Sequence, residues 1–170
     1  MDAIVAIAAF PVTIAVLWGL LRSPLGGRLV AHPTDERWHG QATPLFGGVG
    51  IAAGFGAGVL LALAVGAVQW SGELGGILAG LGIVFAAGLV DDVRHLSPLA
   101  KLGAQIAAAV VALASGLHVE IVGNDVLAWG IGLLWLVGIT NAFNLLDNMD
   151  GLAATLAGVA CAYFAIDALT

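Results

Sequence analysis

Long apolar runs separated by short polar segments set the pattern of this sequence from one end to the other. A helix that crosses a bilayer needs roughly 20 apolar residues, and runs close to that length recur along the chain. We therefore predict spanning helices over residues 3–21, 45–70, 74–90, 102–117, 126–143 and 151–169. This pattern predicts an all-α fold, a polytopic membrane bundle of about six transmembrane helices.

Glycine and alanine dominate the second to fourth of these runs, as in GVGIAAGFGAGVLLALAVG at residues 48–66. Small residues allow membrane helices to approach closely and to pack by van der Waals contact. The pattern Gly48-Val49-Gly50 follows no predicted strand, so it does not indicate a nucleotide-binding loop. The glycines therefore predict helix packing.

Composition supports a membrane protein and excludes some partners. Charged residues make up 9% of the chain and apolar residues 61%, whereas a soluble domain carries roughly 25% charged residues. The net charge of -6 argues against a nucleic-acid partner, which needs a basic face. A lone cysteine, Cys161, excludes an intrachain disulfide, and we expect it to be a small buried hydrophobe.

The basic residues predict the orientation of the bundle, because cytoplasmic loops carry an excess of Lys and Arg. With the N-terminus outside, the cytoplasmic segments are 22–44, 91–101 and 144–150, and the outer segments lie around 71–73 and 118–125. The outer segments contain no Lys or Arg. The first two cytoplasmic segments hold all the basic residues of the chain: Arg22, Arg28, Arg37, Arg94 and Lys101.

An adjacent pair of carboxylates, Asp91 and Asp92, directly follows the third apolar run. Neighbouring carboxylates repel each other, which raises the pKa of one of them unless a cation lies between. Mg²⁺ is typically held by one or two carboxylates together with substrate phosphates. The pair indicates either such a site or an acidic helix end exposed to water.

A second polar pattern recurs every three residues, at Asn141, Asn144, Asp147 and Asp150. Residues three apart lie on neighbouring positions of one helix face. Two carboxamides and two carboxylates on one face suit a metal ion together with a hydrogen-bonding ligand. The alternative is a polar contact within the bundle, since Asn side chains can bond across membrane helices.

Further candidates lie in the same cytoplasmic segments. Lys101 and Gln105 are four residues apart, so both can face one site, and Lys101 either binds a phosphate or is an ordinary basic flank. His39 is a candidate substrate contact in a loop with Arg37. No His and Cys spacing typical of zinc occurs, and we expect the remaining histidines to be interfacial: His32, His95 and His118.

Three segments of the chain resemble motifs of the polyprenyl-phosphate N-acetylhexosamine-1-phosphate transferases, membrane enzymes of glycosyltransferase family 4, in the order found there. The O-antigen or teichoic-acid initiating branch is the more similar one, on the Asn-Met pair within LLDNMDG and on the LSP segment. At Gln41 the chain departs from the muramoyl-pentapeptide branch, which has a lysine there. The segments are HGQATPLFGG from His39, GLVDDVRHLSPLAKLGAQ from Gly88 and NAFNLLDNMDGLAA from Asn141.

The resemblance implies a reaction and a place for it. Family members transfer a sugar 1-phosphate from a UDP-sugar, here a UDP-N-acetylhexosamine, to a polyprenyl phosphate and release UMP, with Mg²⁺ as cofactor. They work on the cytoplasmic face of the bacterial inner membrane in cell-envelope glycan assembly. The mechanism is either direct or passes through a covalent enzyme intermediate.

The resemblance also implies roles for residues. Asp91 would position or deprotonate the lipid phosphate, with Asp92 and Lys101 as its catalytic neighbours. Asn144 matches a Mg²⁺-binding asparagine of the family. The expected substrate-binding residues are His39, Asn141, Asp147 and Asp150.

Two expectations remain beside this hypothesis. No residues here match a further Mg²⁺-binding aspartate and a histidine-rich loop of the family, so we expect one transmembrane domain that is the N-terminal part of a longer enzyme, inactive alone. The rival hypotheses are a non-catalytic scaffold and a transporter or ion-conducting bundle. A transporter's acidic residues should lie near the middle of the membrane.

Overall fold

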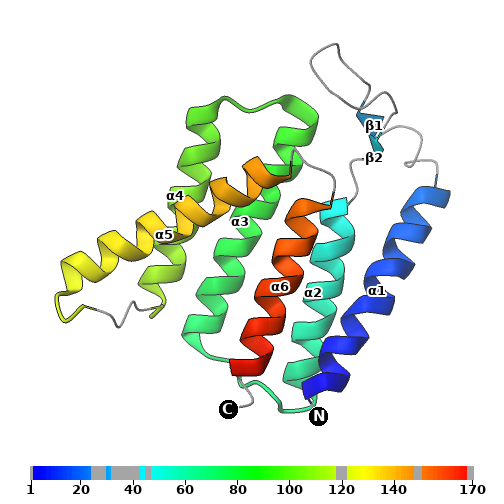
Figure 1. Cartoon of the computed structure of the whole chain (residues 1–170), viewed down its shortest axis with the longest axis horizontal. Coiled ribbons are helices and arrows are strands. Elements are labelled where there is room, and N and C mark those ends of the chain that lie inside the picture. The colour runs from blue at the N-terminus through cyan, green and yellow to red at the C-terminus, as the bar shows by residue number, and fades with distance from the viewer. Residues whose placement is uncertain are drawn as a thin grey trace. The chain divides into compact units, whose positions relative to one another are not determined.

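A computed structural model describes residues 2–23, 30–31, 43–44, 47–117, 122–147 and 151–167 (Figure 1). A two-residue ladder pairs strands β1 (Val30–Ala31) and β2 (Thr43–Pro44) antiparallel. All other elements are helices, so the predicted all-α membrane bundle is confirmed. They are α1 (Asp2–Arg22), α2 (Gly47–Ala64), α3 (Gly72–Arg94), α4 (Pro98–Ala114), α5 (Asp125–Leu146) and α6 (Leu152–Asp167).

Among the described residues, α2, α3 and α5 are long and apolar enough to cross a membrane, with 18, 23 and 22 residues. At a rise of 1.5 Å per residue they extend about 27 to 35 Å, which matches a hydrocarbon core of about 30 Å. Shorter apolar stretches of 10–17 residues lie in α1, α4 and α6. The chain is therefore a multi-pass membrane protein.

Every helix exposes large apolar side chains. Phe10 of α1 is 70% exposed, Leu134 of α5 75% and Phe164 of α6 74%, while none of the described polar or charged residues is buried. Such a surface suits lipid rather than water. Cys161, expected to be buried, is exposed on α6. That prediction was wrong because lipid can cover an apolar helix face that no protein element covers.

The described residues fall into two compact units. One comprises Met1–Ser71 with Gly88–His95, and the other comprises Gly72–Ala87 with Leu96–Thr170. The first contains α1, α2 and the last turns of α3. The second contains the rest of α3 together with α4, α5 and α6.

In the first unit, α1 and α2 pack side by side and antiparallel (Figure 1). A Cβ added to Gly54 of α2 would lie 2.8 Å from the carbonyl oxygen of Ala9 and would clash with the Thr13 hydroxyl. One turn earlier, a Cβ at Gly50 would lie 2.5 Å from Leu17 Cγ. The predicted packing role of these glycines is confirmed.

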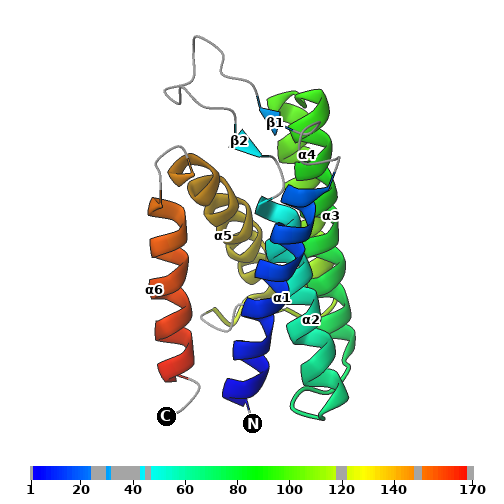
Figure 2. The same cartoon turned by 90° about the vertical axis from the view of Figure 1, so that its right-hand side faces the viewer.

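In the second unit, the first half of α3 packs antiparallel against the second half of α4 (Figure 2). A Cβ at Gly80 would lie 2.8 Å from the Ala108 carbonyl oxygen, and Gly76 meets the Ser115 side chain. The Ser115 hydroxyl also donates to the carbonyl oxygen of Glu73 over 3.4 Å. The α4 face buried in this unit consists of Ala108, Ala109, Ala112 and Leu113.

Several helix ends differ from the predicted spans. Residues 91–94 belong to α3, so Asp91 and Asp92 lie in its last turn rather than after it. α2 ends at Ala64, six residues before the predicted end at 70, and Gly66 there has a φ of 72°. Hydropathy locates the bilayer, whereas backbone hydrogen bonds and left-handed residues end a helix, so the two boundaries need not coincide.

Candidate functional site

The end of α3 is closed by a left-handed residue. His95 has a φ of 48°, and histidine is one of the residue types that adopt this region more often than most. Its backbone N–H donates to the Asp91 carbonyl oxygen over 2.9 Å, and its ring Nδ1 lies 3.3 Å from the same oxygen. This is the single-bond form of a left-handed helix cap.

The start of α4 follows within three residues. The Ser97 hydroxyl accepts from the Ala100 backbone N–H over 3.3 Å, and Pro98 occupies the first turn, as is typical of a helix N-terminus. Lys101 consequently lies in the first turn of α4. The polar stretch 91–101 thus consists of one helix end, a short turn and one helix start.

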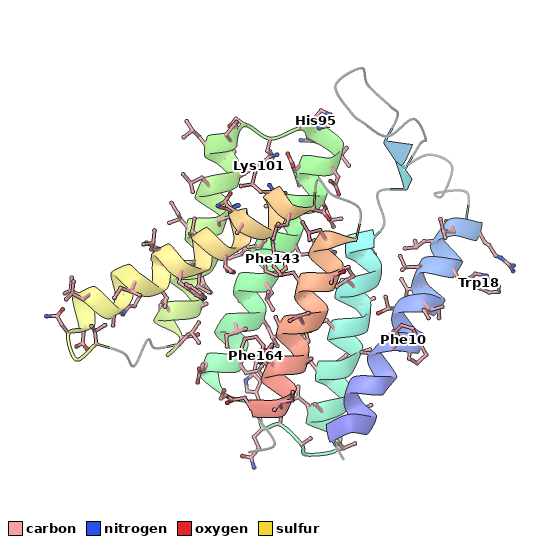
Figure 3. The ribbon with its side chains drawn as sticks, viewed as in Figure 1. Phe10, Trp18, His95, Lys101, Phe143 and Phe164 are labelled. Atoms are coloured by element: carbon pink, nitrogen blue, oxygen red, sulfur yellow. The ribbon has the colours of Figure 1, made fainter. Side chains whose placement is uncertain are left out.

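Exposure differs between the predicted catalytic residues. Asp91 is half-buried on the last turn of α3, whereas its neighbour Asp92 is exposed. Lys101 is half-buried on α4, and Figure 3 marks its position on that helix. All three lie at helix termini.

Every described acidic residue lies at the end of a helix. A carboxylate pathway for ions would require some of them near the middle of the spans. This distribution counts against the transporter hypothesis for the described part of the chain. The residues are Asp2, Glu73, Asp91, Asp92, Asp125, Asp147 and Asp167.

The three-residue pattern of α5 continues to the end of the helix. Asn141 is half-buried and Asn144 exposed within α5. Asp147 is the exposed C-cap, with φ of −68° and ψ of −8°, and its N–H donates to the Phe143 carbonyl oxygen over 3.0 Å. Asp150 and His39 lie outside the described residues, so their predicted roles stay predictions.

Asn141 contacts Gln105 across the α4–α5 boundary. Its Nδ2 donates to Gln105 Oε1 over 2.6 Å, and Gln105 Nε2 donates to Asn141 Oδ1 over 3.4 Å. This is the interhelical contact that the alternative interpretation of the polar pattern describes. The substrate-binding role of Asn141 stays a prediction. Spacing within each helix identified both faces, but it carried no signal that these two faces meet.

The donor atoms at these helix ends suit Mg²⁺ chemically. Carboxylate oxygens of Asp91, Asp92 and Asp147 and the amide oxygen of Asn144 are the hard ligands that Mg²⁺ prefers. Within the described residues, His, Cys, Asp and Glu form no group of three or more that could hold a metal ion. The donor chemistry fits Mg²⁺, and its binding stays a prediction.

Comparison with known proteins identifies one family whose sequence model the chain matches. Residues 74–170 match the sequence model of a family described as glycosyl transferase family 4. This range includes the Asp91–Asp92 pair and the polar pattern of α5. No solved structure matches the chain significantly.

Curated relatives carry related names. The chain is 30% identical to the "Probable undecaprenyl-phosphate N-acetylglucosaminyl 1-phosphate transferase" of Bacillus subtilis strain 168, over 92% of the chain and 47% of that protein. It is 36% identical to the decaprenyl-phosphate N-acetylglucosaminephosphotransferase of Mycolicibacterium smegmatis, over 75% and 35%. It is 31% identical to the phospho-N-acetylmuramoyl-pentapeptide-transferase of Lacticaseibacillus paracasei, over 94% and 57%. The chain thus spans about half the length of these relatives, or less.

Proposed function

The chain belongs to glycosyl transferase family 4, and from this premise we propose that it is part of an enzyme that transfers a sugar 1-phosphate from a UDP-sugar to a polyprenyl phosphate. The observation that carries the proposal is the family match over residues 74–170, which contains two of the three motif segments, those from Gly88 and from Asn141. The names of the relatives support an N-acetylhexosamine 1-phosphate as the transferred group.

The proposed reaction exchanges one phosphorus–oxygen bond for another. The β-phosphorus of the UDP-sugar loses its bond to the UMP oxygen and gains a bond to an oxygen of the lipid phosphate. Both reactants are anions, so groups that balance negative charge lower the barrier. We assign Asp91, with Asp92, to orient or deprotonate the lipid phosphate, and Lys101 to balance phosphate charge.

The end of α5 is the proposed donor site. We assign Asp147, together with Asp150 and His39, to the UDP-sugar, and Asn144 to Mg²⁺. The exposed positions of Asn144 and Asp147 at the helix end support this assignment, because a polar donor reaches them without entering lipid. When bound, Mg²⁺ would neutralise part of the diphosphate charge.

The proposed location is the cytoplasmic face of the bacterial inner membrane, in cell-envelope glycan assembly. Placement of the charged residues at helix ends supports an interfacial site, where a lipid phosphate meets water while its prenyl tail stays in the bilayer. In an Asp92→Cys variant with Cys161→Ala, an impermeant maleimide should label inverted membrane vesicles and not right-side-out ones. Labelling only in right-side-out vesicles would reverse the assignment.

Activity is tested with the complete reading frame that contains this chain. Membranes from cells expressing it receive UDP-N-acetylglucosamine, undecaprenyl phosphate and Mg²⁺. We expect UMP and lipid-linked sugar phosphate in equal amounts, only when the lipid phosphate is supplied, and none after chelation with EDTA. UMP production independent of the lipid phosphate, or no product from any UDP-N-acetylhexosamine, would contradict the proposal.

A further inference from the structure

The contact between Gln105 and Asn141 is a reciprocal pair of side-chain amides. Each residue donates one hydrogen bond to the other and accepts one in return. Both side chains are half-buried, on helices that expose many large apolar side chains. In such surroundings a lost partner is not easily replaced by water, so the two amides hold each other in place.

The orientation of this pair is set by the backbone of α5. The Asn141 amide also donates to the carbonyl oxygen of Val137, one turn earlier, over 2.9 Å. Flipping the Asn141 amide would place its oxygen against that carbonyl oxygen, which cannot donate. Asn141 must therefore present its second N–H to α4, and Gln105 must present its oxygen. Both N–H groups of Asn141 are engaged within the protein.

The pair lies next to the proposed site on both helices. Lys101 precedes Gln105 by about one turn of α4, and Asn144 follows Asn141 by about one turn of α5. A hydrogen bond at this point resists rotation of α5 about its axis. Rotation would change the direction in which Asn144 and the next turn, with Asp147, are presented.

We propose that Gln105 is a positioning residue that acts through Asn141, setting the rotation of α5 and with it the direction of Asn144 and Asp147. This inference rests on the proposed function, because those two residues matter only if they hold the donor and its metal. It also gives Asn141 a positioning role in place of direct contact with the substrate.

An exchange of the two amides tests the inference. Gln is one methylene longer than Asn, so Gln105→Asn alone leaves the pair too short and Asn141→Gln alone makes it too long. The double variant keeps the combined length. We expect each single variant to raise KM for UDP-N-acetylglucosamine about tenfold, less than the roughly hundredfold loss that a misplacement of about 1 Å can cause. The double variant should return KM to within about threefold of wild type, as its pair is restored.

The control is Thr140→Val, on the same turn of α5. The Thr140 hydroxyl donates to the Leu136 carbonyl oxygen over 2.7 Å, within its own helix. Loss of the Thr140 hydroxyl removes a hydrogen bond within α5 and leaves the hydrogen bonds between Asn141 and Gln105 in place. KM should therefore not change. A merely structural effect of the amide variants would lower the amount of folded enzyme and the apparent kcat while leaving KM unchanged.

Each other outcome contradicts the inference in a different way. Unchanged KM in both single variants, with active wild type, would remove the positioning role and leave the proposed function standing. Raised KM in the single variants that the double variant does not restore would indicate direct contact of one amide with substrate. A wild-type enzyme that does not transfer sugar phosphate would overturn the proposed function and this inference together.

Discussion

Two helix pairs of this protein are held together by opposite means. Between α1 and α2, glycines let the backbones approach until a single added carbon would clash. Between α4 and α5, two amide side chains bridge the helices through hydrogen bonds. The first contact depends on the absence of side chains, and the second depends on particular polar ones.

The two kinds of contact have different roles, one in packing and the other in orientation. Close backbone packing tolerates no added atom but carries no chemical group that a substrate would meet. A directional hydrogen bond contributes less packing and instead defines an orientation. We therefore expect changes at the α1–α2 contact to alter stability, and changes around the ends of α3, α4 and α5 to alter catalysis.

The largest expected effect is at the end of α5. Asp147→Asn should lower the rate of UMP release about a hundredfold or more, because a misplacement of the bound substrate by about 1 Å can cost this much. Asp125→Asn is the matched control, since Asp125 lies exposed in the first turn of the same helix and should leave the rate unchanged. Equal rates in both variants would remove Asp147 from the site.

The next effect is on stability at the α1–α2 contact. Gly54→Ala should lower the free energy of unfolding in detergent by about 1–3 kcal/mol, as an overpacked contact does. Gly56→Ala on the same helix is the control, because an added Cβ there meets no atom within 4 Å. Both variants should keep the wild-type KM for the UDP-sugar. A changed KM in Gly54→Ala would weaken the separation between packing and catalysis.

A smaller effect is expected at the start of α4. Lys101→Gln removes a positive charge proposed to balance phosphate, and should lower kcat/KM about tenfold, as losing a hydrogen bond to a charged group does. Lys101→Arg keeps the charge and should retain most of the activity. If steady-state kinetics show Lys101→Gln at the wild-type value, the residue is only a basic flank of the membrane span.

Much of the fold could be predicted from the sequence because lipid imposes a simple rule. Apolar runs of membrane length had to become helices, and each predicted span overlaps one helix. Helix ends were harder to predict. The last turn of α3 contains Asp91 and Asp92 because His95 closes the helix in a left-handed conformation, and hydropathy contains no information on that hydrogen bond.

Part of the candidate site could also be predicted from the sequence. The spacing of Asn141, Asn144 and Asp147 predicted one helix face, and the helix extends to Leu146 with Asp147 as its C-cap. The partner of Asn141 could not be predicted, because a pattern within one helix does not tell which neighbouring helix it meets. Burial of Cys161 was mispredicted for a related reason, since an apolar environment in this protein includes the lipid.

The most direct test of the proposed phosphotransfer site compares the two ends of α3. UMP release from UDP-N-acetylglucosamine, with undecaprenyl phosphate and Mg²⁺, is measured for wild type, Asp91→Asn and Glu73→Gln in the complete reading frame. Glu73 lies in the first turn of α3 and Asp91 in its last. We expect wild type and Glu73→Gln to release UMP at similar rates, and Asp91→Asn to be at least about a hundredfold slower. A wild-type rate in Asp91→Asn would contradict the assignment of this helix end to the reaction.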